Sequence, residues 1–146
     1  MNAKRVMITG EDLASQLRKH LTHAFEINVV IRLSDPFVST ITRDMMVSAA
    51  DKVWSVWKEN VNDCDKQAMA VVNECHRRAA SESMPWAVGF LRAATIKPGP
   101  QIRTRPAVDH VYTWFFESAE SLVIFDQTNR LWHTPAQLRA VDFVFG

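Results

Sequence analysis

Residues 62–80 read NDCDKQAMAVVNECHRRAA, and this stretch decides the fold because it has the pattern of a helix with one buried face. Small apolar residues recur at three- and four-residue steps, the spacing of one stripe along an α-helix. The stripe consists of Cys64, Ala68, Val71, Val72, Cys75 and Ala79. Asn62 and Asp63 are both good N-caps, so the sequence predicts a helix from one of them to about Ala80, with Cys64 in its first turn.

Two further helices are predicted before this one. The first is capped by Thr9 or Gly10 and runs to about Phe25, with Leu13, Leu17 and Leu21 on its apolar side. A short β-branched segment, 27–33, indicates a strand. The second helix covers about 43–60 and turns six residues inward: Met46, Ala50, Val53, Trp54, Trp57 and Val61.

The second half of the chain has the pattern of strands. A strand is expected over 86–91, followed by an irregular connection, 93–107, that contains three prolines. The apolar runs 108–116 and 122–126 flank the polar segment ESAES, which is typical of an antiparallel hairpin. Helices first and strands after predict an α+β fold, in which helices pack on a small antiparallel sheet.

Composition restricts the class of protein. The chain has 146 residues, 47% of them hydrophobic, which fits a single domain over 1–146. A net charge of +1 is too small for the broad basic field of non-specific nucleic-acid binding. Neither a bilayer-spanning apolar run nor a signal-like segment is present, so we expect a cytoplasmic protein without a membrane or nucleic-acid partner.

The two cysteines have different positions on the predicted helix. Cys64 and Cys75 are eleven residues apart, which is about 16 Å along a helix and beyond the reach of a disulfide. Cys64 lies at the helix start, where free N–H groups and the helix dipole favour a thiolate. A nucleophilic thiol also needs a base and a group that orients the base.

The hairpin supplies a histidine and an acid for this purpose. Opposite residues of an antiparallel hairpin have numbers with a constant sum, so a turn centred on Ser118 places His110 opposite Asp126. A centre at Ala119 leaves Asp126 one diagonal away on the same face. A centre between the two places Gln127 opposite His110. We favour Asp126 as the orienting group and keep Gln127 as the alternative.

Each of these residues also has a structural interpretation. A cysteine on an apolar stripe is most often a core residue, and an acid at a strand end often caps a turn. His20, His23, Cys75 and His76 lack the second close-spaced pair that a structural zinc site requires. No glycine-rich phosphate loop is present, so no metal and no cofactor are expected.

The residues 62–68, Asn-Asp-Cys-Asp-Lys-Gln-Ala, resemble the signature that opens the central helix of papain-like and transglutaminase-like cysteine peptidases. His110-Val111 and the later run 123–128 are similar to the corresponding pattern in the papain-like domain of some mushroom agglutinins and related bacterial or phage proteins. The resemblance covers about 45–133 and leaves 1–40 as an unassigned extension of the same domain. It implies a papain/transglutaminase-like fold.

The resemblance also implies roles for the candidate residues. Cys64 would be the nucleophile, His110 the base and Asp126 the orienting acid. The function expected on these grounds is a thiol-dependent amide-bond hydrolase with a protein or peptide substrate, in which Asn60 or Asn62 could add an oxyanion donor to the Cys64 N–H. The alternative is an inactive relative that docks on a host protein through a loop carrying three basic residues, Lys97, Arg103 and Arg105.

Overall fold

The computed structural model describes residues 4–54, 64–95 and 110–146, and its centre is a six-stranded sheet in the order β2-β8-β4-β5-β6-β7. The strands are β2 (Phe25–Arg32), β4 (Val88–Thr95), β5 (His110–Ser118), β6 (Ser121–Asp126), β7 (Leu131–His133) and β8 (Leu138–Phe145). β2 and β8 run parallel, and the other neighbours run antiparallel. A separate antiparallel pair consists of β1 (Met7–Thr9) and β3 (Phe37–Ser39).

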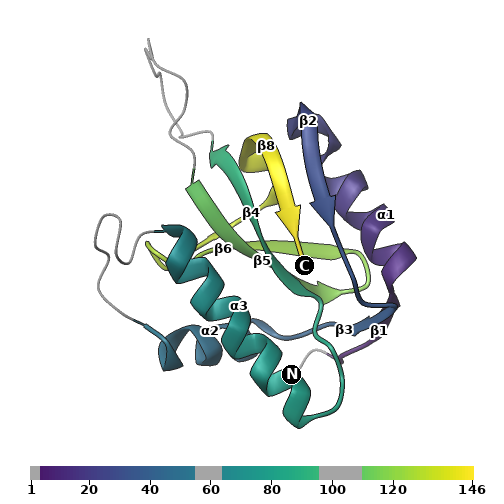
Figure 1. The fold of residues 1–146 in the computed structure, drawn as a ribbon, viewed down its shortest axis with the longest axis vertical. Coiled ribbons are helices and arrows are strands. Elements are labelled where there is room, and N and C mark those ends of the chain that lie inside the picture. Colours follow the sequence, from purple (N-terminus) through teal and green to yellow (C-terminus); the bar gives the residue numbers. More distant parts are fainter. Residues whose placement is uncertain (1–3, 55–63, 96–109) are drawn as a thin grey trace.

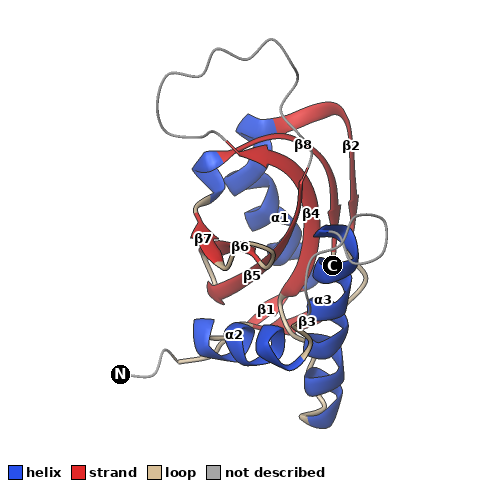
Figure 2. Ribbon diagram, turned by 90° about the vertical axis from the view of Figure 1, so that its left-hand side faces the viewer, coloured by secondary structure: helices blue, strands red, loops and turns tan. Residues whose placement is uncertain are grey.

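Helices pack on both faces of the sheet, as Figures 1 and 2 show. One face is covered by α1 (Gly10–Leu21), which continues into the 3-10 turn η1 (Thr22–Ala24). The other face is covered by α2 (Arg43–Lys52) and α3 (Cys64–Ser81). A second 3-10 turn, η2 (Pro135–Gln137), precedes β8. Among the described residues, none of these helices has the length and apolar character needed to cross a membrane.

α1 confirms the sequence prediction. The hydroxyl of Thr9 accepts a hydrogen bond from the Asp12 N–H at 3.1 Å, which satisfies one of the unpaired donors at the helix start. The three leucines of the predicted stripe are buried, and they pack against the side chains that β5 and β6 project to this face: Tyr112, Trp114, Phe116, Leu122 and Ile124. Sequence periodicity therefore located both this helix and its buried side.

α2 is shorter than predicted. It ends at Lys52, and the N–H of Val53 bonds to the carbonyls of Ala50 and Asp51 in a tighter final turn. Trp54, predicted to point inward, is 60% exposed, so that prediction is wrong. Trp57 lies outside the described residues.

The β5–β6 hairpin decides between the three registers left open by the sequence. Thr113 pairs with Phe125, and Phe116 pairs with Leu122. In both pairs the two residue numbers average to 119, so the turn is centred at Ala119. In this register Asp126 and His110 share one face of the sheet on a diagonal.

The predicted fold class, an α+β papain/transglutaminase-like domain with helices first and a small antiparallel sheet, is wrong. β2 precedes α2 and α3 in the chain, and it lies parallel to β8 in a mixed sheet of six strands. β8 escaped prediction because its most buried residues, Leu138, Val141 and Val144, are three apart and do not alternate. The irregularity arises at Ala140, whose φ of 54° accompanies a register shift against β4.

Candidate functional site

Three element ends meet at the candidate site. Cys64 is the first described residue of α3, His110 the first residue of β5 and Asp126 the last residue of β6. The structure therefore brings together the three residues that the sequence singled out, although 46 and 16 residues separate them along the chain. Figure 1 shows the described start of α3 close to the start of β5.

Asp126 orients the imidazole of His110. The Nε2 of His110 lies 3.0 Å from Oδ1 of Asp126. The same oxygen accepts hydrogen bonds from the N–H groups of Thr128 at 3.1 Å and Asn129 at 3.0 Å, while Oδ2 accepts one from the Asn129 amide at 2.9 Å. Asp126 is 4% exposed. This acid thus caps the turn after β6 and holds the histidine ring at the same time.

Cys64 interacts with the same ring. Its thiol is a hydrogen-bond partner of the His110 side chain, and the backbone of Val111 donates a further hydrogen bond to the sulfur. Because Nε2 is directed at Asp126, Nδ1 is the ring nitrogen left to face Cys64. The three side chains form a continuous series from sulfur through imidazole to carboxylate.

The electrostatics of the site favour a charged pair. The hydrogen bond with His110 lowers the pKa of Cys64 against an opposing effect of burial. Burial lowers the pKa of His110, but its hydrogen bonds with Asp126 and Cys64 outweigh this effect and raise the pKa to about 9. Burial raises the pKa of Asp126, but bonds from His110 and Asn129 hold it at about 2. This combination favours a thiolate beside an imidazolium that is held by a carboxylate.

Gln127, the alternative orienting residue, lies on the other side of the strand. Its Oε1 accepts hydrogen bonds from the N–H and the hydroxyl of Thr113, both at 3.1 Å. Its Nε2 donates to the carbonyls of Val111 at 2.8 Å and Cys64 at 3.2 Å. The His110 ring is therefore oriented by Asp126, and Gln127 contacts the backbone around it.

A second histidine, which was not predicted from the sequence, lies near this carboxylate. Nε2 of His133 lies 4.0 Å from Oδ2 of Asp126. The Tyr112 ring stands edge-on to both histidines, with its centroid 4.5 Å from that of His110 and 5.8 Å from that of His133. The signal was weak because β7, which carries His133, has only three residues. Trp132, which precedes His133 in β7, packs on Phe115 and Phe125 of the opposite face.

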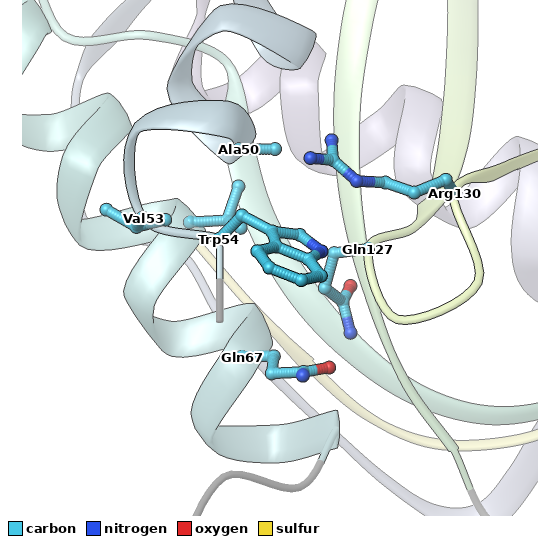
Figure 3. A pocket seen from close by; sticks show the side chains of 7 residues that line it. Ala50, Val53, Trp54, Gln67, Gln127 and Arg130 are labelled. Atoms are coloured by element: carbon cyan, nitrogen blue, oxygen red, sulfur yellow. The ribbon is translucent and has the colours of Figure 1, made fainter. Parts of the chain in front are cut away.

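A narrow pocket opens beside the site (Figure 3). Its lining consists of Ala50, Val53, Trp54, Gln67, Val71, Gln127 and Arg130. Trp54 and Gln127 lie close together across it in Figure 3. Its free volume of about 10 Å³ has room for about one water molecule.

The described residues contain no cluster of three or more acidic, histidine or cysteine side chains that could hold a metal ion. Within that range, His20 is engaged with the carbonyl of Glu120 at 2.8 Å. The proposed oxyanion donors Asn60 and Asn62 lie outside the described residues. The basic loop residues Lys97, Arg103 and Arg105 lie outside them as well.

Comparison with known proteins gives similarity at the level of structure. No family model and no curated protein sequence matches the chain. One similar solved structure is described as a PSL1a–E64 complex, with a TM-score of 0.74 at 17% identity over 96% of this chain and 51% of that chain. Another is the Polyporus squamosus lectin bound to the human-type influenza-binding epitope Neu5Aca2-6Galb1-4GlcNAc, with a TM-score of 0.73 at 18% identity over 96% of this chain and 49% of that chain. The chain thus spans about half the length of these proteins, and the likeness establishes its fold.

These findings correct several expectations from the sequence. The papain-like or transglutaminase-like peptidase family is not supported by any family model, and the two solved structures named above are those of a lectin. The expected functions, an amide-bond hydrolase or a protein that docks on a host protein, are corrected because the similar solved structures are those of a lectin. The expected protein or peptide partner is also wrong, because the partner named for the lectin is a glycan. The chain has the fold of one half of a lectin.

Proposed function

We propose that Cys64, His110 and Asp126 form a nucleophilic thiol site that carries out acyl transfer through a Cys64 thioester. The observation that supports this proposal is the hydrogen-bonded series of the three side chains, with Nε2 of His110 3.0 Å from Asp126 and the thiol bonded to the same ring. A buried core cysteine has no need of such partners. Cys75, which is buried in the apolar cluster below α3, illustrates the difference.

Cys64 and His110 account for every bond and proton that changes in this reaction. The Cys64 thiolate attacks the carbonyl carbon of an acyl donor, a carbon–sulfur bond forms, and the bond to the leaving oxygen breaks as His110 donates its proton to that oxygen. The neutral imidazole then takes a proton from the acceptor that attacks the thioester. The thiolate leaves with its electron pair, and the site returns to its starting charge. Asp126 keeps the ring in place and stabilises its charged form.

An activated ester tests the reaction directly. With p-nitrophenyl acetate, the protein is expected to release nitrophenolate in a burst of one equivalent and to gain one acetyl group on Cys64, detected by peptide mass spectrometry. Cys64→Ser is the test variant and Cys75→Ser the matched control. A burst that survives in Cys64→Ser, or is absent from the unaltered chain, overturns the proposal.

The compound E64 provides a second probe of the same thiol. E64 carries an epoxide, and a thiolate opens an epoxide by attack at carbon. We expect one E64 adduct per chain, located on Cys64 and lost in His110→Ala. An adduct on Cys75, or equal rates in the unaltered and His110→Ala proteins, contradicts the proposed pair. Its use here is supported by the structural likeness to PSL1a, which is described in complex with E64.

Glycan binding is the second candidate function, favoured by the shared fold with a lectin bound to Neu5Aca2-6Galb1-4GlcNAc. We infer that the ligand class to test is a sialylated glycan. Titration of the labelled chain with this trisaccharide should shift amide signals saturably, whereas the asialo disaccharide should not. The absence of any shift rejects glycan binding by this chain.

A further inference from the structure

Gln127 is a buried polar residue whose amide is almost completely used. It is 5% exposed and follows directly after β6. Its oxygen accepts both polar hydrogens of Thr113, and its nitrogen donates to two carbonyls. A flipped amide would set its oxygen against those two carbonyl oxygens, so the partners fix its orientation.

The two carbonyls belong to the nucleophile and to the residue next to the base, two groups whose distance matters for the reaction. One is the carbonyl of Cys64 at 3.2 Å, and the other is that of Val111 at 2.8 Å, next to His110. Val111 also donates its N–H to the Cys64 sulfur. A single amide therefore joins the backbone of the nucleophile to the peptide segment that carries the base.

A neighbouring contact joins the same elements. The hydroxyl of Thr128 donates to Oε1 of Gln67 at 2.6 Å, and Gln67 lies one turn after Cys64 on α3. Nε2 of Gln127 also lies 3.4 Å from that hydroxyl. α3 and the turn after β6 are thus connected twice, and Gln127 alone contacts both α3 and β5 among these side chains.

The distance between a thiolate and its base is sensitive to small movements. A displacement of about 1 Å between reacting groups can reduce a rate by about 100-fold. α3 packs on the sheet mainly through apolar side chains: Val71, Val72, Cys75 and Ala79. Apolar contacts are not directional, so they specify the position of the helix less strictly than hydrogen bonds do. Hydrogen bonds to backbone carbonyls do have direction.

We propose that Gln127 is a positioning residue that fixes Cys64 relative to His110 by bonding the Cys64 and Val111 carbonyls at once. This inference rests on the proposed function of the Cys64 site. It assigns to Gln127 a role distinct from orienting the imidazole, which belongs to Asp126. It also explains why the residue after the orienting acid is a buried amide rather than an apolar strand residue.

The test measures the pH dependence of Cys64 alkylation by iodoacetamide in two variants. Gln127→Met removes all the hydrogen bonds at similar volume. Gln127→Glu keeps the size and the acceptor toward Thr113 but cannot donate when ionised. Gln137→Met is the matched control, because Gln137 lies in η2 and its side chain caps only Thr134.

We expect the alkylation rate of Cys64 at pH 6.5 to fall about tenfold or more in both Gln127 variants and its pH midpoint to move upward. The Gln137 variant should keep the profile of the unaltered chain. A purely structural role predicts a lower melting temperature with an unchanged midpoint, and that outcome overturns the inference. If Gln127→Met does not fold, Gln127→Leu, which likewise forms no hydrogen bond and adds no charge next to the thiolate, decides. A midpoint near the ordinary thiol value of about 8.5 in the unaltered chain would instead reject the proposed function itself.

Discussion

Cys64 and Cys75 lie on the same helix, yet their surroundings give them opposite chemistry. Cys64 is partly exposed at the described start of α3, where hydrogen bonding to His110 lowers the pKa of its thiol. Cys75 is buried about three turns further along, where loss of hydration raises the pKa of its thiol to about 12. Residue type and helix are shared, so the difference comes from the burial of Cys75 and from the hydrogen-bond partners that β5 supplies to Cys64.

The largest effect is expected when the two thiols compete for one reagent. At pH 6.5, iodoacetamide should modify Cys64 at least about 1000-fold faster than Cys75, because Cys75 is both protonated and shielded until the helix opens. Peptide mass spectrometry over time gives the two rates. Cys64→Ala should leave almost no labelling in the native protein. Comparable labelling rates at Cys64 and Cys75 would contradict the claim that their surroundings give them opposite chemistry.

Removal of the histidine should reduce the difference in reactivity between the two cysteines. In His110→Ala, labelling of Cys64 at pH 6.5 is expected to slow about 100-fold, the usual scale of a general base. Because the folded-state pKa of His110 is raised to about 9, its interactions stabilise the fold fully below its ordinary pKa of about 6.5 and are lost as the pH rises through 9. Thermal unfolding of both proteins across this pH range should therefore show a difference that shrinks at high pH.

A smaller effect is expected from Asp126→Asn. The amide still reaches the ring but carries no charge, so the imidazolium is less stable and labelling of Cys64 at pH 6.5 should slow about tenfold. Glu74→Gln serves as the control, since Glu74 pairs with Arg77 and Arg78 away from the site. Labelling that is slowed equally in both variants would point to general electrostatics and against a specific role of Asp126.

The smallest effect concerns stability. Here substitution of Cys75 should matter more than substitution of Cys64, the reverse of their order in reactivity. Cys75→Ser places a hydroxyl in the apolar cluster below α3 and should cost about 1–2 kcal/mol in the free energy of unfolding. Cys64→Ser should change it by less than about 0.5 kcal/mol, because the side chain is partly exposed. Urea denaturation of the two variants checks this order. A larger loss for Cys64→Ser would assign that residue to the core.

The sequence predicted the proximity of Cys64, His110 and Asp126 better than it predicted the fold. Helical periodicity placed Cys64 and Cys75, and the polar segment between two apolar runs located the hairpin that carries His110 and Asp126. Turn centring could not be decided from sequence, since a shift of half a residue exchanges Asp126 for Gln127. The number of strands in the sheet was underestimated because β8 is irregular at Ala140. β8 also pairs with the distant β2, and pairing over a long sequence separation leaves no local pattern.

The exposed tryptophan after α2 shows a second reason for error. Trp54 continues the three- and four-residue spacing of the helix, but α2 ends at Lys52, and neither Val53 nor Trp54 belongs to the helix. Periodicity predicts a buried side only while the helix lasts. No breaker residue marks the end, because Val53 closes the turn through its backbone alone.

The central claim, a Cys64 thiolate stabilised by His110, is tested most directly by titration of the thiolate through its ultraviolet absorbance. Cys75→Ala leaves Cys64 as the one titrating thiol, and the double variant Cys64→Ser/Cys75→Ala supplies the baseline. We predict a thiolate signal that persists well below pH 8.5 and that moves upward to the ordinary thiol range in His110→Ala. A single step near pH 8.5 that is unaffected by His110→Ala would contradict the account.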